Sequence, residues 1–145
     1  MTLKKRGINY FGDTQNDILE ALQLYSQDGY FAEHFQSAFC SCGSNLFSLL
    51  VDENEGVAIR VCNSCKNEHP IGDSKEYMEE AELEECECPC GYSVFEITVG
   101  VSLYKNSNDV KWVYIGCRCP NCGLTACYAD WKNEYENFKE FLKLI

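Results

Sequence analysis

Hydrophobic and polar residues alternate along the second half of the chain. Between positions 95 and 103, phenylalanine, isoleucine, valine, valine and leucine occupy every second position, which is the period of a β-strand with one buried face. A second apolar run, 110–115, follows the polar stretch "KNSND". We therefore predict a β-hairpin here, with Trp112 and Tyr114 on one face of its returning strand.

A similar pattern lies in the first half of the chain. The apolar runs "LFSLLV" (46–51) and "VAIRV" (57–61) flank the stretch "DENEG", whose polar residues and glycine are typical of a turn. These two runs predict another β-hairpin, so strands are expected in both halves of the protein.

Three other segments have the apolar spacing of helices. Segment 13–27 carries an apolar stripe, and segment 75–85 places apolar residues among glutamates. The second of these follows Asp73 and Glu76, which have the spacing of a capping box. Aromatic residues recur at helical spacing from about Asn133 onward. We expect an N-terminal, a linking and a C-terminal helix.

The two predicted hairpins belong to an internal repeat. Each is preceded by a Cys-x-Cys-Gly stretch and followed by Cys-x-x-Cys, which indicates that one supersecondary unit occurs twice. A hairpin brings its two ends together, so each unit should gather four cysteines. The first set is Cys40, Cys42, Cys62 and Cys65, and the second set is Cys88, Cys90, Cys119 and Cys122.

The chain has 11 cysteines. An odd number, clustering in closely spaced pairs and the lack of a signal-peptide pattern favour metal-binding thiolates in a reducing compartment over disulfides. Four thiolates on two tight turns are the ligand set of structural zinc, so we predict two structural Zn²⁺ ions. No run approaches the roughly 20 apolar residues of a membrane span, and we expect a cytoplasmic protein without a membrane partner.

The stretch "CPNCG", 119–123, resembles the rubredoxin-type knuckle of the zinc ribbon group of folds. Its final glycine tolerates positive φ, which lets backbone N–H groups turn toward the sulfur atoms. The stretches "CSCG" and "CPCG" are one residue shorter than the usual first knuckle of that group. The resemblance covers 40–72 and 88–129, more than half of the chain, and implies a tandem pair of zinc ribbons.

Together, the apolar pattern and the resemblance predict an α+β fold: two small antiparallel β zinc ribbons with N-terminal, linking and C-terminal helices. The expected segments are an N-terminal helical segment (1–37), zinc ribbon 1 (38–73), an acidic linking helix (74–87), zinc ribbon 2 (88–130) and a C-terminal helix (131–145).

Some residues leave alternatives open. Cys86 and Cys117 each precede a predicted ligand by two residues, so they are either free thiols or substitute ligands. Cys127 is expected in the core of a strand, and His69 is an alternative ligand four residues after Cys65. Iron is the alternative metal, because rubredoxin-type sites also pair such knuckles. A zinc enzyme needs an open coordination position, so complete sets of four predict a protein without catalysis.

The formal net charge is −11, and eight thiolates with two Zn²⁺ would make it more negative by four charges. Such a surface repels phosphate backbones, which makes nucleic acid the less favoured partner. The second hairpin is the exception, because Lys105, Lys111 and Arg118 lie near Trp112 and Tyr114 in the sequence. A nucleic-acid-binding or transcription- or translation-associated adaptor, as many zinc ribbons are, would use this surface.

Acidic residues are concentrated in segment 73–87, which has eight of them and one lysine. Such a run is either a solvated face or a surface that steers a basic protein into contact. The chain is similar in size and acidity to bacterial toxin-immunity proteins, which implies neutralisation of a nuclease-type toxin. The residues expected to bind a basic protein are Glu76, Glu79, Glu80, Glu84, Glu85, Trp112 and Tyr114.

Overall fold

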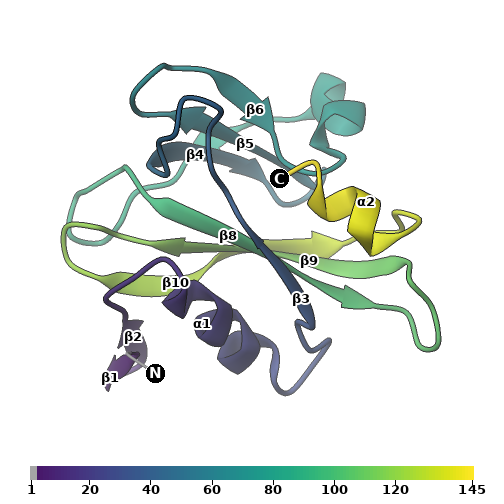
Figure 1. Cartoon of the computed structure of the whole chain (residues 1–145), viewed down its shortest axis with the longest axis horizontal. Helices are drawn as coiled ribbons and strands as arrows, with labels where there is room; N and C mark the ends of the chain where they lie inside the picture. Colours follow the sequence, from purple (N-terminus) through teal and green to yellow (C-terminus); the bar gives the residue numbers. More distant parts are fainter. Residues whose placement is uncertain (1–2) are drawn as a thin grey trace.

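The computed structural model describes residues 3–145, so the first two residues of the expected segment 1–37 lie outside it. Two antiparallel sheets pack against each other, and helix α1 covers the outer face of the larger one (Figure 1). The strands are β1 (Lys4–Arg6), β2 (Asn9–Phe11), β3 (His34–Ser37), β4 (Phe47–Asp52), β5 (Val57–Cys62), β6 (Glu68–Pro70), β7 (Glu84–Glu85), β8 (Glu96–Leu103), β9 (Val110–Arg118) and β10 (Leu124–Lys132). The helices are α1 (Asp17–Ser26), the 3₁₀ helix η1 (Ser74–Glu80) and α2 (Phe138–Leu142).

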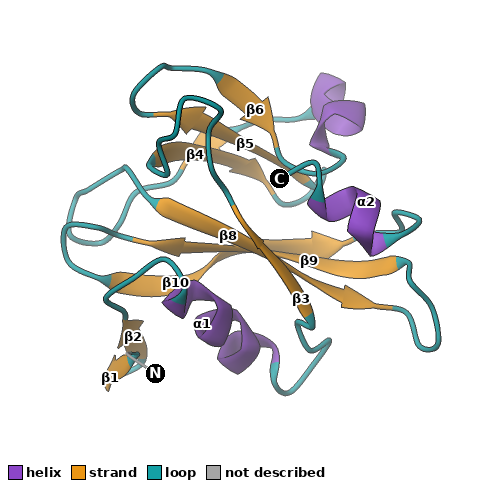
Figure 2. Cartoon of the chain, viewed as in Figure 1, coloured by secondary structure: helices purple, strands orange, loops and turns teal. Residues whose placement is uncertain are grey.

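Both predicted hairpins are confirmed. Strands β4 and β5 pair with Phe47 opposite Cys62, and β8 and β9 pair with Ile97 opposite Cys117. A third strand follows each hairpin, because β6 pairs with β5 and β10 pairs with β9. The strand orders are β6-β5-β4-β7 in the smaller sheet and β1-β2-β10-β9-β8-β3 in the larger (Figure 2).

The two repeats exchange strands. Strand β3 comes just before the first cysteine of repeat 1 (40–72), yet it pairs with β8 of repeat 2 (88–129). Strand β7 comes just before the first cysteine of repeat 2, yet it pairs with β4 of repeat 1. The segment that precedes each repeat therefore completes the sheet of the other repeat, so neither sheet is built from one repeat alone.

The exchange is centred on two equivalent phenylalanines. The backbone N–H of Phe47 donates to the carbonyl of Phe95 at 2.8 Å, and that of Phe95 donates back to Phe47 at 2.8 Å. Both side chains are fully buried, in a core that both sheets line with apolar residues such as Leu49, Val99 and Ile115. The alternation seen in the sequence thus places one face of each sheet in a shared core.

The expected α+β fold with helices around two small ribbons is wrong. Strands make up 38% of the structure and helices 15%, and the two sheets are larger than isolated ribbons because β1, β2, β3 and β7 extend them. None of the helices within residues 3–145 is long and apolar enough to cross a membrane.

The acidic linking helix does not form over its expected length. Segment 74–80 is a 3₁₀ helix, and Glu84–Glu85 is a strand whose neighbour Cys86 donates its N–H to Leu49 at 2.8 Å. Like charges three and four residues apart destabilise an α-helix, and pairing with an open sheet edge satisfies the backbone instead. The side chain of Asp73 does not cap a helix; it accepts from Asn133 Nδ2 at 3.1 and 3.2 Å.

The other two helices are shorter than expected. Asn133 and Phe138 donate their backbone N–H groups to the β8–β9 hairpin, at Lys111 and Asn108, so α2 begins only after Asn137. Within the expected segment 13–27, α1 is confirmed from Asp17, and the preceding residues form a turn around the Asp17 carboxylate.

Candidate metal centres

The structure brings the two predicted sets of cysteines together. Within each set, the four sulfur atoms all lie within 4.8 Å of one another. Metal site 1 consists of Cys40, Cys42, Cys62 and Cys65, and metal site 2 consists of Cys88, Cys90, Cys119 and Cys122. Among residues 3–145, no other group of histidine, cysteine or acidic side chains converges in this way.

The sulfur atoms pair across the knuckles in the same manner at both sites. At metal site 1, the first cysteine lies 3.5 Å from the fourth, and the second lies 3.6 Å from the third. The corresponding distances at metal site 2 are 3.5 and 3.7 Å. In each pair one thiol is buried and the other is exposed.

These separations fit a four-coordinate metal. A Zn–S bond of about 2.3 Å in a tetrahedron requires sulfur atoms about 3.8 Å apart, whereas a disulfide would require about 2.05 Å. The observed 3.5–3.7 Å is close to the first value. The two groups of four thiols can therefore each hold one metal ion, and all four positions of a tetrahedron would be occupied by protein ligands.

The short Cys-x-Cys-Gly turns have the same backbone conformation in both repeats. Gly43 N–H donates to the carbonyl of Cys40 at 2.9 Å, and Gly91 N–H donates to Cys88 at 2.7 Å. Their φ angles are +96° and +95°, a region that residues with a Cβ rarely adopt. The missing residue relative to the usual first knuckle is thus accommodated by glycine.

The two Cys-x-x-Cys turns are followed by different residues in the same backbone conformation. Gly123 has φ of +85° and Lys66, in the same place, has φ of +65°. Both donate a backbone N–H to the carbonyl of the cysteine four residues earlier, at 2.8 and 3.0 Å. Because a left-handed conformation costs a residue with a Cβ about 1–2 kcal/mol, metal site 1 carries backbone strain that metal site 2 lacks.

Backbone N–H groups favour the thiolate form at both sites. The N–H of Cys65 lowers the pKa of Cys62 to about 6, and the N–H of Tyr92 lowers the pKa of Cys90 to about 6. Burial acts in the other direction and raises the pKa of Cys88 to about 12. A bound cation would compensate for the cost of gathering several thiolates, part of them buried.

Arg60 lies beside metal site 1 and was not identified from the sequence. It is 6% exposed, its guanidinium lies 4.7 Å from the Phe47 ring centroid, and Nε and Nη2 donate to the Ile145 carbonyl. Burial lowers the pKa of its guanidinium, and the thiolate charges of Cys40 and Cys62 act in the opposite direction. The only signal in the sequence is a cation within the apolar strand "VAIRV", two residues before a ligand.

The surroundings of metal site 2 are different. Cys117 takes the place in repeat 2 that Arg60 has in repeat 1, two residues before the third ligand, and burial raises its pKa well above the usual value. Asn121 Nδ2 donates to Cys90 Sγ at 3.6 Å. The two sites therefore share their ligands and turns, while their neighbouring charges differ.

The remaining cysteines and histidines lie outside both metal sites. Cys117 is buried, and Cys86 and Cys127 are partly buried. His69 Nε2 is 2.8 Å from the Leu144 carbonyl, and His34 stacks on Phe138 with ring centroids 4.0 Å apart. No residue of this group belongs to a set of converging ligands.

The structure separates the predicted partner-binding residues. Tyr114 is 3% exposed and its hydroxyl donates to the carbonyl of Tyr30, while Trp112 Nε1 donates to Asp130 at 2.8 Å; both pack in the apolar cluster beneath α1. Ring faces covered in this way cannot stack on bases. The acidic members Glu76, Glu79, Glu80, Glu84 and Glu85 are exposed, on η1 and β7.

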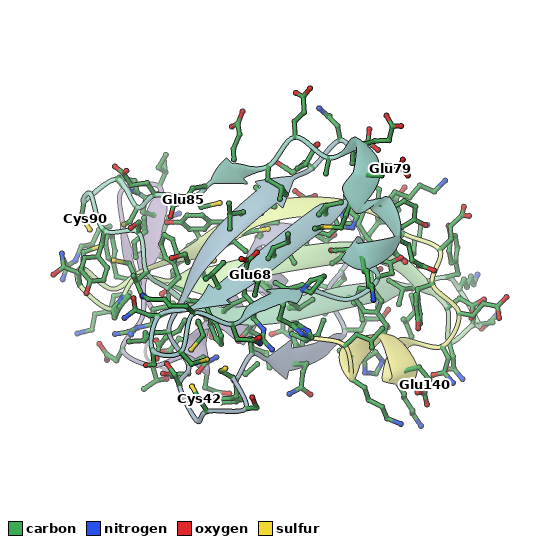
Figure 3. The ribbon with its side chains drawn as sticks, turned by 90° about the horizontal axis from the view of Figure 1, so that it is seen from above. Cys42, Glu68, Glu79, Glu85, Cys90 and Glu140 are labelled. Atoms are coloured by element: carbon green, nitrogen blue, oxygen red, sulfur yellow. The ribbon has the colours of Figure 1, made fainter. Side chains whose placement is uncertain are left out.

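The knuckles and part of the acidic surface lie at different ends of the molecule. In Figure 3, Cys42 and Cys90 lie toward one end, and Glu79 and Glu140 lie toward the other.

Comparison with protein-family models, with curated proteins and with solved structures gave no match. The geometry of the chain itself is therefore the basis for assigning its function.

Proposed function

We propose that the protein is a non-catalytic binding protein, stabilised by two structural Zn²⁺ ions, whose acidic surface binds a basic protein partner. The observation that carries this proposal is the pair of complete four-thiolate sites. With four protein ligands per metal, no coordination position is left for a substrate or a reactive water.

Zinc is favoured over iron by the number of sites and by their role in the fold. Each site ties a hairpin to the segment that precedes it, and the two exchanged strands end shortly before the first ligand of each site. Structural zinc contributes folding free energy in such small units. An iron-sulfur electron carrier needs one exposed centre, and a pair of equivalent sites gives it no advantage.

The acidic character supports the choice of partner. The formal net charge is −11, and the glutamates of η1 and β7 are exposed. A negative surface raises the association rate with a positively charged protein and disfavours nucleic acid. An immunity protein that occludes a basic nuclease toxin is the specific function we infer, by similarity in size and acidity.

A capture experiment from the native host tests this proposal. The zinc-loaded protein is immobilised, and bound protein and nucleic acid are identified after elution with increasing salt. We expect a basic protein that elutes at moderate salt, because screening shortens electrostatic attraction to about 10 Å at 0.1 M salt. Recovery of RNA or DNA without a basic protein would contradict the proposal.

A further inference from the structure

Arg60 is a buried cation whose direct contacts are all neutral. Its Nε and Nη2 atoms donate to the Ile145 carbonyl at 3.2 and 2.9 Å, and Nη2 lies 3.5 Å from the Phe39 carbonyl. The Phe47 ring centroid lies 4.7 Å from Cζ. Among residues 3–145, Nη1 has no hydrogen-bond partner and no carboxylate forms an ion pair with this guanidinium. A buried charge without a counter-charge is costly, so its placement needs an explanation.

The negative charges nearest to this cation belong to metal site 1. Arg60 lies on β5, two residues before Cys62, and the carbonyl of Phe39 that it approaches directly precedes Cys40. Burial lowers the pKa of the guanidinium, and the thiolates of Cys40 and Cys62 raise it. These two cysteines are the buried ligands of metal site 1. The guanidinium therefore faces the side of the site that is shielded from solvent.

A zinc ion alone would not neutralise such a site. Four thiolates around one Zn²⁺ carry two negative charges in excess. The guanidinium stays protonated in proteins, and its attraction to thiolates is weakly screened where both are buried. Arg60 can therefore offset part of the excess charge at the two ligands that water stabilises least.

Metal site 2 has no cation of this kind. The equivalent position, two residues before its third ligand, holds an uncharged cysteine. The nearby Arg118 is already paired with Glu96, at 2.7 Å. Lys4 and Arg6 line a cavity together with Cys122, but both are exposed, and exposed charges are strongly screened. Only metal site 1 thus has a buried cation that is free of a carboxylate.

We propose that Arg60 is the charge-compensating residue of metal site 1. Its guanidinium balances part of the negative charge of zinc and four thiolates, and in turn the metal-bound thiolates are the counter-charge of a cation that has no other. Arg60 thereby helps metal site 1 to hold zinc in spite of the backbone strain at Lys66. This inference rests on the proposed function, because it takes the two structural zinc ions from it.

Three variants of the full-length zinc-loaded protein separate charge from packing. Arg60→Met removes the charge and keeps an unbranched side chain, whereas Arg60→Lys keeps the charge and loses the planar fork. Lys66→Met is the matched control, because it removes one exposed positive charge directly after the ligand Cys65. Circular dichroism and metal analysis measure whether each variant folds and binds two zinc ions.

The first measurement is the loss of zinc from metal site 1. Each protein is held in excess chelator, samples are labelled briefly with iodoacetamide, and mass spectrometry follows the labelling of Cys42 and Cys65, the exposed ligands of this site. We expect labelling about tenfold faster in Arg60→Met, and less than about threefold faster in Arg60→Lys and in Lys66→Met. Labelling of Arg60→Met at the rate of the unmodified protein, or of Lys66→Met at the rate of Arg60→Met, would overturn the proposal.

A spectroscopic measurement distinguishes charge compensation from a purely structural role. In the Co²⁺-substituted protein, a cation beside the thiolates stabilises their electrons and raises the energy of the thiolate-to-cobalt charge-transfer absorption. We expect this absorption at lower energy in Arg60→Met and close to its original position in Arg60→Lys. An absorption that does not move in Arg60→Met would show that Arg60 acts through packing and hydrogen bonds alone.

The outcome stays decisive when Arg60→Met does not fold. In that case Arg60→Lys decides, since a folded protein with two zinc ions supports charge compensation and an unfolded one overturns it. Metal analysis of the unmodified protein separates this proposal from the proposed function. Fewer than two zinc ions per chain would contradict the proposed function, whereas two zinc ions whose release does not depend on Arg60 would contradict only the role of Arg60.

Discussion

At the scale of single residues, the metal sites depend on where each thiol lies. Cys62 and Cys119 are fully buried, each at the end of a hairpin and next to the shared core. Replacing one of these ligands would break the metal site and leave the other three thiols without a cation to compensate their charge. These two ligands should therefore be the least tolerant of substitution.

Cys62→Ser and Cys119→Ser should each remove one zinc ion and destabilise the protein strongly. Structural zinc in small units contributes about 10–16 kcal/mol at pH 7, which is as large as the whole stability of a typical domain. Native mass spectrometry of the metal content and circular dichroism measure both effects. Cys127→Ser, a partly buried cysteine outside both sites, is the control that should keep two zinc ions.

Lys66→Gly should stabilise the protein by about 0.5–1 kcal/mol. Glycine relieves a left-handed conformation that costs about 1–2 kcal/mol, and its greater freedom in the unfolded chain takes back part of the gain. The reverse change, Gly123→Ala, should destabilise, because its φ is +85° and a Cβ would lie 3.1 Å from the Gly12 carbonyl. Chemical denaturation with zinc present measures the free energy of unfolding of both variants. A Lys66→Gly variant that is less stable than the unmodified protein would contradict backbone strain at Lys66.

The eight metal-binding cysteines could be predicted from the sequence, because the spacing of the ligands within each turn is a local property of the chain. The Cys-x-Cys-Gly turns could be recognised since the cysteines and the positive-φ glycine are neighbours along the chain. The position of Arg60 could not be recognised, because its side chain bonds to Ile145, 85 positions away. Nothing within a short window indicates that a buried cation will lie at such a contact.

At the scale of elements, strand exchange joins the two repeats. Strand β3 pairs with β8 and β7 pairs with β4, and the Phe47 and Phe95 backbones bond to each other between them. Unfolding one repeat would therefore expose a strand edge in the sheet of the other repeat, together with the core that the two sheets share. The two metal sites should behave as one cooperative structure.

Losing metal site 2 should weaken zinc binding at metal site 1. In the Cys119→Ser variant we expect a chelator to extract the remaining zinc at least about tenfold faster than from the unmodified protein, which corresponds to a barrier lower by about 1.4 kcal/mol or more. Stopped-flow absorbance with a chromogenic chelator gives the rate. An unchanged rate would mean that the repeats act as independent ribbons.

The hairpins and the N-terminal helix could be predicted from the sequence, whereas the fate of the acidic linking segment could not. The alternation from 95 to 103 is strong because each strand has one face in the core. The expected helix at 75–85 failed because its glutamates repel one another within a helix, while an open edge of β4 was available to Glu84 and Glu85. That edge belongs to a strand more than 30 residues earlier. The sequence of 75–85 alone therefore does not show that a sheet edge competes with the helix for this segment.

At the scale of the whole molecule, the metal sites and part of the acidic surface lie in different places. The knuckles labelled Cys42 and Cys90 lie away from Glu79 and Glu140 (Figure 3). The two zinc ions that we propose would thus stabilise a surface that they do not touch. The binding surface should exist only when both metals are present.

Removing zinc should unfold the entire molecule. We expect excess chelator to abolish the β-sheet signal in circular dichroism, and zinc added under reducing conditions to restore it, because the binding free energy of zinc is part of the folding free energy. The basic protein partner should bind only to the refolded form. A metal-free protein that keeps its sheets would contradict the structural role of zinc.

X-ray absorption spectroscopy at the zinc edge, combined with metal analysis, tests the central claim most directly. We predict two zinc ions per chain, each with four sulfur neighbours at about 2.3 Å and no nitrogen or oxygen in the first coordination shell. Iron in place of zinc, a single metal per chain, or a light-atom ligand that opens a coordination position would contradict the account.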